Sequence, residues 1–260
     1  MLRKLKEMEG YSIISRDGEE FGRARDFLFD DQEWRIRYLL LDTGGWLSGR
    51  QVILPPGVLL TPRWLERTFP VNLTKGEVEA SPPIEADEPV SHQAQGRLMR
   101  HLSLQPYWAG HGLYGQPMEP THKEQQGHVA QADDEAEVVD EIADRGDPHL
   151  RSANEIIGYH IQARDGEIGH IEDFIVEDGT WTIRHAMVDT RNWLPGKTVL
   201  ISIPWMDAID WAVGKVRVDL TRESIEKSPS FDPSEPVNRG YEEVLYDYYG
   251  RPHYWKVTKE

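Results

Sequence analysis

The feature that most constrains the fold of this chain is an internal repeat. Residues 10–82 recur at 158–229 with one residue of slippage, after which the offset stays at 147. Positions shared by the two copies include Gly10 and Gly158, Tyr11 and Tyr159, Gly22 and Gly169, Asp26 and Asp173, Trp34 and Trp181, Asp42 and Asp189, and Trp64 and Trp211. A fixed offset over this span indicates a duplicated structural unit. Residues kept in both copies are therefore expected to serve the fold rather than a single active site.

The repeat divides the 260-residue chain into two domains with tails. The predicted boundaries are a first domain at 1–82, its tail at 83–115, a mobile acidic linker at 116–148, a second domain at 149–229 and an aromatic-rich tail at 230–260. Domains this small bury only about 60% of the surface of their unfolded chain. We therefore expect the copies to pack on each other within the chain or on a partner, and a homodimer is a further alternative.

Composition argues against several classes of protein. The chain has no cysteine, which excludes disulfide scaffolds and Cys-ligated metals and fits a reducing cytoplasm. The first ten residues lack the apolar core of a signal peptide, and no stretch approaches 18 apolar residues, so we expect no membrane insertion. The net charge of −16 repels phosphate backbones and disfavours nucleic-acid binding.

Each copy has the pattern of short strands separated by turns. Asp-Gly at 17–18 and at 165–166 predicts hairpins with type I′ turns, which need positive φ at both central residues. Thr74 and Thr221 each have the position of an N-cap for a single helical turn. Several short strands with no long helical pattern predict a mainly β chain of two small, closed or nearly closed β-barrels with helical or irregular tails.

The order of these motifs resembles the PRC-barrel family, named from the cytoplasmic domain of the photosynthetic reaction-centre H subunit. The second copy carries the resemblance best, through Gly158-Tyr159, Asp165-Gly166, Gly169, Asp173-Phe174, Trp181-Thr182-Ile183-Arg184, Val188-Asp189-Thr190 and Trp193-Leu194-Pro195-Gly196-Lys197. The resemblance covers about 200 residues of the chain. It implies tandem barrels of the kind found in soluble bacterial members, which are binding or scaffolding modules rather than enzymes. No photosynthetic role is carried over, because the membrane helix of the H subunit has no counterpart here.

Two repeated arginines are candidate partner contacts. Arg37 and Arg184 lie five residues before Asp42 and Asp189, a spacing that places each pair on opposite faces of one strand. A ligand-binding Arg/Asp couple is one interpretation. We favour the alternative that each Asp accepts backbone N–H groups in the turn that follows.

Exposed aromatic pairs give the remaining candidates. Trp46-Leu47 and Trp193-Leu194 lie in loops, where they plug a barrel end, pack between the copies or anchor a partner. We favour packing over external recognition. Tyr254 and Trp255 close the second tail, and wrapping of the barrel is favoured over base stacking because basic residues do not accompany them.

No pattern in the chain predicts catalysis, a cofactor or a metal site. The motifs G-x-S-x-G, H-E-x-x-H and G-x-x-x-x-G-K-[ST] are absent, and the histidines near the first tail lack ligand spacing. We therefore expect a non-enzymatic cytoplasmic binding or adaptor protein that presents paired barrels to a protein partner, with a membrane-associated complex of the reaction-centre kind as one candidate. The alternative is a stress-related sensor that binds a small molecule or metal.

Overall fold

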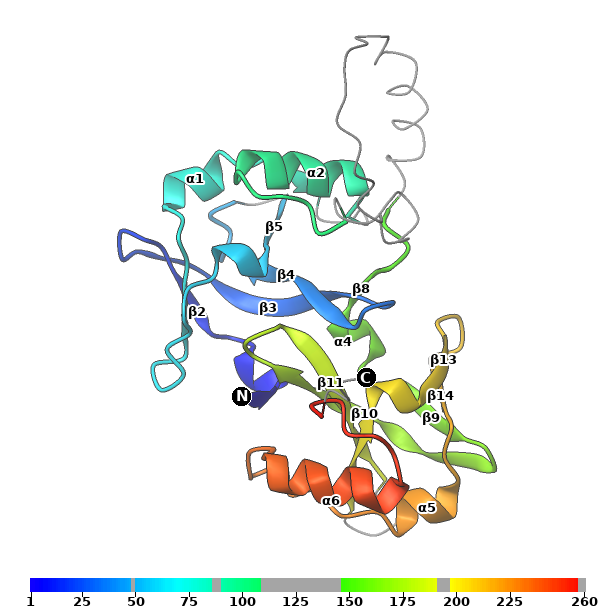
Figure 1. Ribbon diagram of the computed structural model, residues 1–260. Coiled ribbons are helices and arrows are strands. Elements are labelled where there is room, and N and C mark those ends of the chain that lie inside the picture. Colours follow the sequence, from blue (N-terminus) through cyan, green and yellow to red (C-terminus); the bar gives the residue numbers. More distant parts are fainter. Residues whose placement is uncertain (48–49, 86–89, 109–145, 191–196, 257–260) are drawn as a thin grey trace, which may run out of the picture.

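The computed structural model describes residues 1–47, 50–85, 90–108, 146–190 and 197–256 (Figure 1). We call residues 1–108 the first half and residues 146–256 the second half. Strands dominate both, so the predicted mainly β fold with two small barrel-like units is confirmed. In Figure 1 the sheets of the two halves meet in the middle of the molecule, and the helices that end each half lie at opposite ends.

The strands of the two halves correspond one to one along most of the repeat. Those of the first half are β1 (Leu2–Lys4), β2 (Ser12–Ile14), β3 (Glu20–Asp30), β4 (Arg35–Asp42), β5 (Arg50–Leu54), β6 (Thr68–Pro70) and β7 (Ile84–Glu85). Those of the second half are β8 (Leu150–Ser152), β9 (His160–Ala163), β10 (Gly166–Glu177), β11 (Thr182–Asp189), β12 (Thr198–Ser202), β13 (Met206–Asp210) and β14 (Lys215–Val218). The first half pairs in the order β6-β2-β3-β4-β5, and the second in the equivalent order β14-β9-β10-β11-β12. Each sheet curls into a half-barrel. It is not a closed barrel, because no strand pairing within the described residues joins its two ends.

The predicted hairpins are present, but their turn type differs from the prediction. Gly18 has φ +89° and Gly166 has φ +142°, whereas neither Asp17 nor Asp165 has positive φ. In the first half the loop is longer than two residues, because Ser15 N donates to Glu19 O at 2.8 Å and closes it. In the first half, loop length, which the Asp-Gly dipeptide does not report, therefore excludes the type I′ turn.

Short helices cover the ends of both sheets. They are the 3-10 turns η1 (Lys6–Met8), η2 (Pro56–Val58) and η3 (Ile203–Trp205), and the α-helices α1 (Lys75–Glu79), α2 (His92–His101), α4 (Ala153–Ile156), α5 (Arg222–Glu226) and α6 (Arg239–Tyr249). The predicted caps are confirmed, since Thr74 with Glu77 and Thr221 with Ser224 form complete capping boxes. The tail helices α2 and α6 each pack on the barrel of their own half through buried side chains such as Leu98 and Leu245.

The two halves exchange their first strands. β1 of the first half pairs with β10 of the second, with Arg3 opposite Val176, and β8 of the second half pairs with β3 of the first, with Arg151 opposite Phe29. The two pairings are related by the repeat offset. The last residues of β10 and of β3, beyond their pairing with β9 and β2, therefore receive their neighbouring strand from the other half.

A repeated aspartate secures each exchanged segment. Asp173 accepts hydrogen bonds from Phe174 N at 2.7 Å and from Lys6 N of the first half at 3.1 Å. Asp26 likewise accepts from Phe27 N at 2.7 Å and from Asn154 N of the second half at 3.2 Å. The Asp-Phe motif thus recurs because each copy needs a buried acceptor for the turn that its partner half inserts.

The halves also join directly at their centre. Arg35 on β4 lies opposite Thr182 on β11, with Ile36 N donating to Trp181 O at 2.8 Å and Ile183 N donating to Trp34 O at 2.7 Å. One hydrophobic core contains buried residues from both halves, among them Leu5 of the first and Phe174 of the second. Such burial stabilises by about 1.5–3 kcal/mol for each large apolar side chain. The expected copy-to-copy packing is confirmed.

Candidate functional site

Two hollows flank the central junction, and each is lined by residues of both halves. The first hollow has a volume of about 230 Å³ and is lined by residues that include Arg35, Arg37, Pro56, Tyr107, Thr180 and Trp181. The second has a volume of about 340 Å³ and is lined by residues that include Glu33, Trp34, Thr182, Arg184, Ser202 and Tyr254. Most of these residues correspond through the repeat offset. The hollows are therefore a pseudo-symmetric pair that exists only when the halves are joined.

The tryptophans at the junction have an unusual backbone. Trp34 has φ +53° and Trp181 has φ +57°, in the left-handed region that large side chains rarely adopt. Each is held there by the hydrogen bond to its carbonyl and by ring packing, with Trp34 stacked on Phe29 at a centroid distance of 5.1 Å. Strained positions of this kind cluster at functional sites. Both tryptophans line a hollow, which makes the junction the best-supported site.

An arginine stacked on a tyrosine forms a wall of each hollow. The Arg37 guanidinium lies 4.0 Å from the centre of the Tyr107 ring, and that of Arg184 lies 4.5 Å from the centre of the Tyr254 ring. Cation–π contacts of this kind contribute about 0.5–2 kcal/mol. They also hold each guanidinium in one orientation.

The carboxylates around the two arginines differ. Arg184 is bonded to Glu177 Oε2 from Nε at 3.1 Å and from a terminal nitrogen at 2.5 Å. In the first half the equivalent of Glu177 is the shorter Asp30, which lies 3.8 Å from Arg37, and Glu33 takes its place at 2.7 Å. The buried Arg37 Nε has no hydrogen-bond partner within the described residues. The first hollow is thus the less completely paired of the two.

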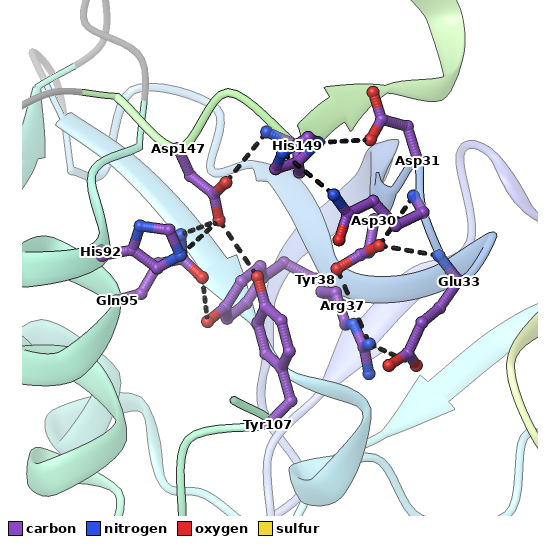
Figure 2. Close-up of polar contacts among 11 residues, drawn as sticks. Asp30, Asp31, Glu33, Arg37, Tyr38, His92, Gln95, Tyr107, Asp147 and His149 are labelled. Atoms are coloured by element: carbon purple, nitrogen blue, oxygen red, sulfur yellow. Dashed lines mark hydrogen bonds and ion pairs between the residues drawn. The ribbon is translucent and has the colours of Figure 1, made fainter. Parts of the chain in front are cut away.

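Asp147 anchors the tyrosine of the first hollow (Figure 2). Its carboxylate accepts hydrogen bonds from Tyr107 OH at 3.1 Å, from Gln95 Nε2 at 3.1 Å and from His149 N at 2.9 Å, and His92 Nε2 lies 3.1 Å from it. Asp147 is buried, so these donors replace water around its charge. Asp147, which the sequence analysis assigned to the mobile linker, is therefore a buried residue that supports Tyr107 from behind the wall of the first hollow.

A second buried tyrosine extends this network. Tyr38 on β4 is fully buried, and its OH donates to Gln95 Oε1 at 2.9 Å. Burial, and then the charge of Asp147, raise the pKa of both Tyr38 and Tyr107. Both hydroxyls are consequently fixed as donors: that of Tyr107 donates to Asp147, and that of Tyr38 donates to the amide oxygen of Gln95.

Glu242 anchors the tyrosine of the second hollow. It accepts a hydrogen bond from Tyr254 OH at 2.8 Å and lies 2.9 Å from the guanidinium of Arg239. His185, the counterpart of Tyr38, lies 3.8 Å from Glu242 and is fully buried. Burial, with a smaller effect of the charges of Arg184 and Arg239, lowers the pKa of His185 to about 3, so this ring is neutral near pH 7.

Tyr107→Phe is expected to lower the free energy of unfolding by about 1–2 kcal/mol. The substitution keeps the ring over Arg37 but removes one donor to the buried Asp147. The matched control is Tyr248→Phe, because the exposed Tyr248 hydroxyl donates to Ser224 O at 2.9 Å and its loss should change stability by less than about 0.5 kcal/mol. Urea denaturation of both variants tests the difference. Equal losses would contradict the stabilising role given to the hydrogen bond between Tyr107 and Asp147.

The hollows bring together some of the sequence-predicted contacts. Arg37, Arg184 and Tyr254 line them, and Trp255 packs behind Tyr254 at a centroid distance of 4.9 Å. The tail aromatics therefore wrap their own barrel, as expected.

The loop contacts lie elsewhere. Trp46 and Leu47 are half-buried against the core of the first half, where Trp46 contacts Phe21 at a centroid distance of 6.3 Å. This agrees with packing rather than external recognition. Trp193 and Leu194 lie outside the described residues. At the other repeated acid, Asp42 Oδ1 accepts a hydrogen bond from Gly44 N at 2.9 Å, so the turn interpretation is confirmed for Asp42.

Sequence reasoning missed Tyr107, Asp147 and Glu242 as site residues. Two signals were available. Tyr107-Trp108 and Tyr254-Trp255 are related by the same offset of 147, and so are Gln95 and Glu242, which occupy the same place on the tail helices. Asp147 offered no such signal, because its acidic neighbours made it one charge among many.

Comparison with known proteins identifies the fold. The model of the PRC-barrel domain matches residues 2–72 and 148–225, which together are more than half of the chain. The chain belongs to the PRC-barrel domain family. Both matched ranges contain the exchanged strand of their half, so β1 and β8 are part of the PRC-barrel pattern.

A relative and two structural findings complete this picture of the PRC-barrel protein. An uncharacterized protein of Deinococcus radiodurans is 40% identical over 48 residues, and the alignment spans 18% of each chain. Within the described ranges, no helix is both long and apolar enough to cross a bilayer. In the same part of the chain, no three His, Asp or Glu side chains gather as metal ligands.

Proposed function

We propose that this PRC-barrel protein is a non-enzymatic adaptor whose two hollows receive side chains of a protein partner. The observation that carries the proposal is the pseudo-symmetric pair of composite hollows beside the junction. Two such hollows beside one shared core present paired contact points, which suits the recognition of an extended protein surface. The absence of cysteine favours action in a reducing compartment such as the cytoplasm.

The sizes of the hollows favour a side chain over a metabolite. Pockets for drug-sized ligands range from about 300 to 1,000 Å³. The first hollow, at about 230 Å³, is smaller than this range, and the second, at about 340 Å³, is at its lower end. Aromatic and arginine side chains, which are enriched at interface hot spots, line both.

The chemistry of the walls supports binding rather than catalysis. The carboxylates nearest the arginines are already bonded to them, and the two tyrosine hydroxyls donate to buried acids. An acid–base mechanism needs a titratable group that is free to reach the substrate. The groups that line these hollows are instead committed to holding the walls in place.

Arg35→Glu tests the proposal at the first hollow. Arg35 is exposed, lines this hollow and makes no side-chain hydrogen bond or ion pair with another described residue, so it is available to a partner. Affinity purification from native lysate with quantitative mass spectrometry should recover a reproducible partner with the wild-type chain. Recovery should fall about tenfold with Arg35→Glu, the loss expected when a contact of about 1.4 kcal/mol is removed.

The control is Arg217→Glu, which makes the same charge change on an exposed position of β14 outside both hollows. It should retain the partner. Failure to recover any reproducible partner, or equal loss with both variants, would contradict binding through the hollows. A small molecule that raises the melting temperature of the wild type but not of Arg35→Glu would instead favour the ligand-binding alternative.

A further inference from the structure

The interface between the halves has the form of a two-fold symmetric dimer interface. The exchanged strands β1 and β8, the aspartate contacts to Lys6 N and Asn154 N, and the reciprocal hydrogen bonds of Trp34 and Trp181 are each related by the repeat offset. An interface in which equivalent residues contact each other reciprocally is the isologous kind found in homodimers. Its contacts depend on one first half and one second half, and none of them requires that both belong to the same chain.

The exchanged segments give this interface its specificity. Leu5 and Met8 of the first half are buried in the shared core, where the second half supplies Ala153 and Ile156 at the equivalent places. Because Ala153 is much smaller than Leu5, a second half paired with another second half would leave a cavity beside Phe174. The preferred partner of a second half is therefore a first half.

We propose that this interface also serves as an association surface between two copies of the chain. The first half of one chain pairs with the second half of another, and the reciprocal pairing closes a dimer. Each dimer carries two complete junctions and hence two pairs of hollows. Domain swapping of this kind needs no new contact, because every interaction is one that the monomer already makes.

Concentration during folding decides between the two forms. A covalent connection gives pairing within one chain an effective concentration on the order of 1 mM. Chains that fold together at about 10 µM should then give dimer at roughly 1% of the monomer, and chains at about 300 µM roughly 30%. The ratio is expected to rise in proportion to chain concentration. Once formed, the dimer should persist on dilution, since separation requires the shared core to open.

The test uses two full-length variants and the absence of natural cysteine. One chain carries Arg35→Cys and the other carries Thr182→Cys. These residues are directly opposite on β4 and β11, and the flanking hydrogen bonds make them a non-hydrogen-bonded antiparallel pair. Such pairs have Cα atoms about 4.5 Å apart, within the range that a disulfide spans. The chains are mixed, unfolded, refolded at several concentrations and oxidised with oxidised glutathione, which accepts the two electrons.

A disulfide between chains forms above the random level in this mixture when the first half of one meets the second half of the other in the native register. We expect a cross-linked species of twice the chain mass that increases about tenfold, relative to monomer, for a tenfold increase in refolding concentration. A mixture of Arg35→Cys chains alone measures random cross-linking. A single chain with both substitutions should form the bond internally and shows that the pair is competent. Cross-linking at the random level at 300 µM, with a competent control, would overturn the proposal.

Discussion

Asp173→Ala is expected to lower the free energy of unfolding by about 2–4 kcal/mol. The substitution leaves two backbone donors without their acceptor, Lys6 N and Phe174 N, at a site where the Asp173 side chain is only 2% exposed. Lys6 belongs to the segment that the first half inserts into the second, so the loss also weakens the junction. Because one core spans both halves, unfolding should remain a single transition at a lower urea concentration.

Asp173→Asn separates the hydrogen bonds of this residue from its charge. The asparagine oxygen still accepts from both backbone donors, so most of the stability should remain. Burial raises the pKa of Asp173 to about 6, above its unfolded value of about 3.9. Because the folded state binds this proton more tightly than the unfolded state, protonation of Asp173 stabilises the fold. The contribution is complete below the unfolded pKa and is lost as the pH rises through 6. The asparagine variant should therefore lack the gain that the wild type obtains from this group between pH 7.5 and pH 4.5.

Asp42→Ala provides the matched control for the alanine substitution. Asp42 also accepts a backbone hydrogen bond, from Gly44 N, but it lies in an exposed turn. Its loss should be below about 1 kcal/mol, because water replaces the missing partner. The measurement is urea denaturation of all three variants at pH 7.5 and pH 4.5. An Asp173→Ala protein as stable as Asp42→Ala would contradict the role given to this carboxylate.

The contrast between Asp42 and Asp173 also shows what sequence could and could not predict. Both recur in the repeat, and both act as acceptors of backbone N–H groups. The acceptor role of Asp42 was predictable because its partner is two residues away. The role of Asp173 was not, because its partner Lys6 lies in a segment 167 residues distant that the repeat did not include.

Exchange of the first strands was beyond local patterns for the same reason. Residues 2–4 and 150–152 are three-residue strands with no alternation of apolar and polar side chains to mark them. Only the pairing partner, β10 or β3 of the other half, makes them strands. The fold class, the hairpins at the two Asp-Gly positions and the helix caps depend on short-range signals, and these were predicted.

The recurring glycines show a similar division. A Cβ on Gly169 would lie 2.1 Å from Asp189 O, and one on Gly22 would lie 3.0 Å from Asp42 O. Recurrence in both copies indicated a structural requirement, but the cause is a close approach of two strands. For the candidate site, the arginines and Tyr254 were found from recurrence, whereas the buried acids required the tail helices to be placed on the sheets.

The second large effect concerns His185 and the dependence of stability on pH. Neither ring nitrogen of this buried residue has a hydrogen-bond partner within the described residues, although Glu242 lies 3.8 Å away. Its folded pKa of about 3 is below the unfolded value of about 6.5. Between these values the unfolded chain binds a proton that the folded chain does not. The contribution of His185 is therefore lost as the pH falls below 6.5.

His185→Gln should remove this loss. At pH 5, about 1.5 units below the unfolded pKa, the wild type should have lost about 2 kcal/mol through His185, at about 1.4 kcal/mol per unit. Between pH 7.5 and pH 5, the free energy of unfolding of the variant should therefore fall less than that of the wild type by this amount. Burial raises the pKa of the neighbouring Glu242 and acts in the opposite direction, but Glu242 is present in both proteins. The comparison between the two proteins therefore isolates the imidazole.

Urea denaturation at pH 7.5 and pH 5 provides the measurement, with His160→Gln at the exposed first residue of β9 as the matched control. The loss of stability on acidification should be the same in the control as in the wild type and smaller in His185→Gln. If all three proteins lost the same stability on acidification, the buried ring would not be a site of differential protonation. A departure confined to His185→Gln would show that this histidine makes the second half sensitive to acid. The first half has the non-basic Tyr38 at the equivalent position, so duplication alone did not supply this sensitivity.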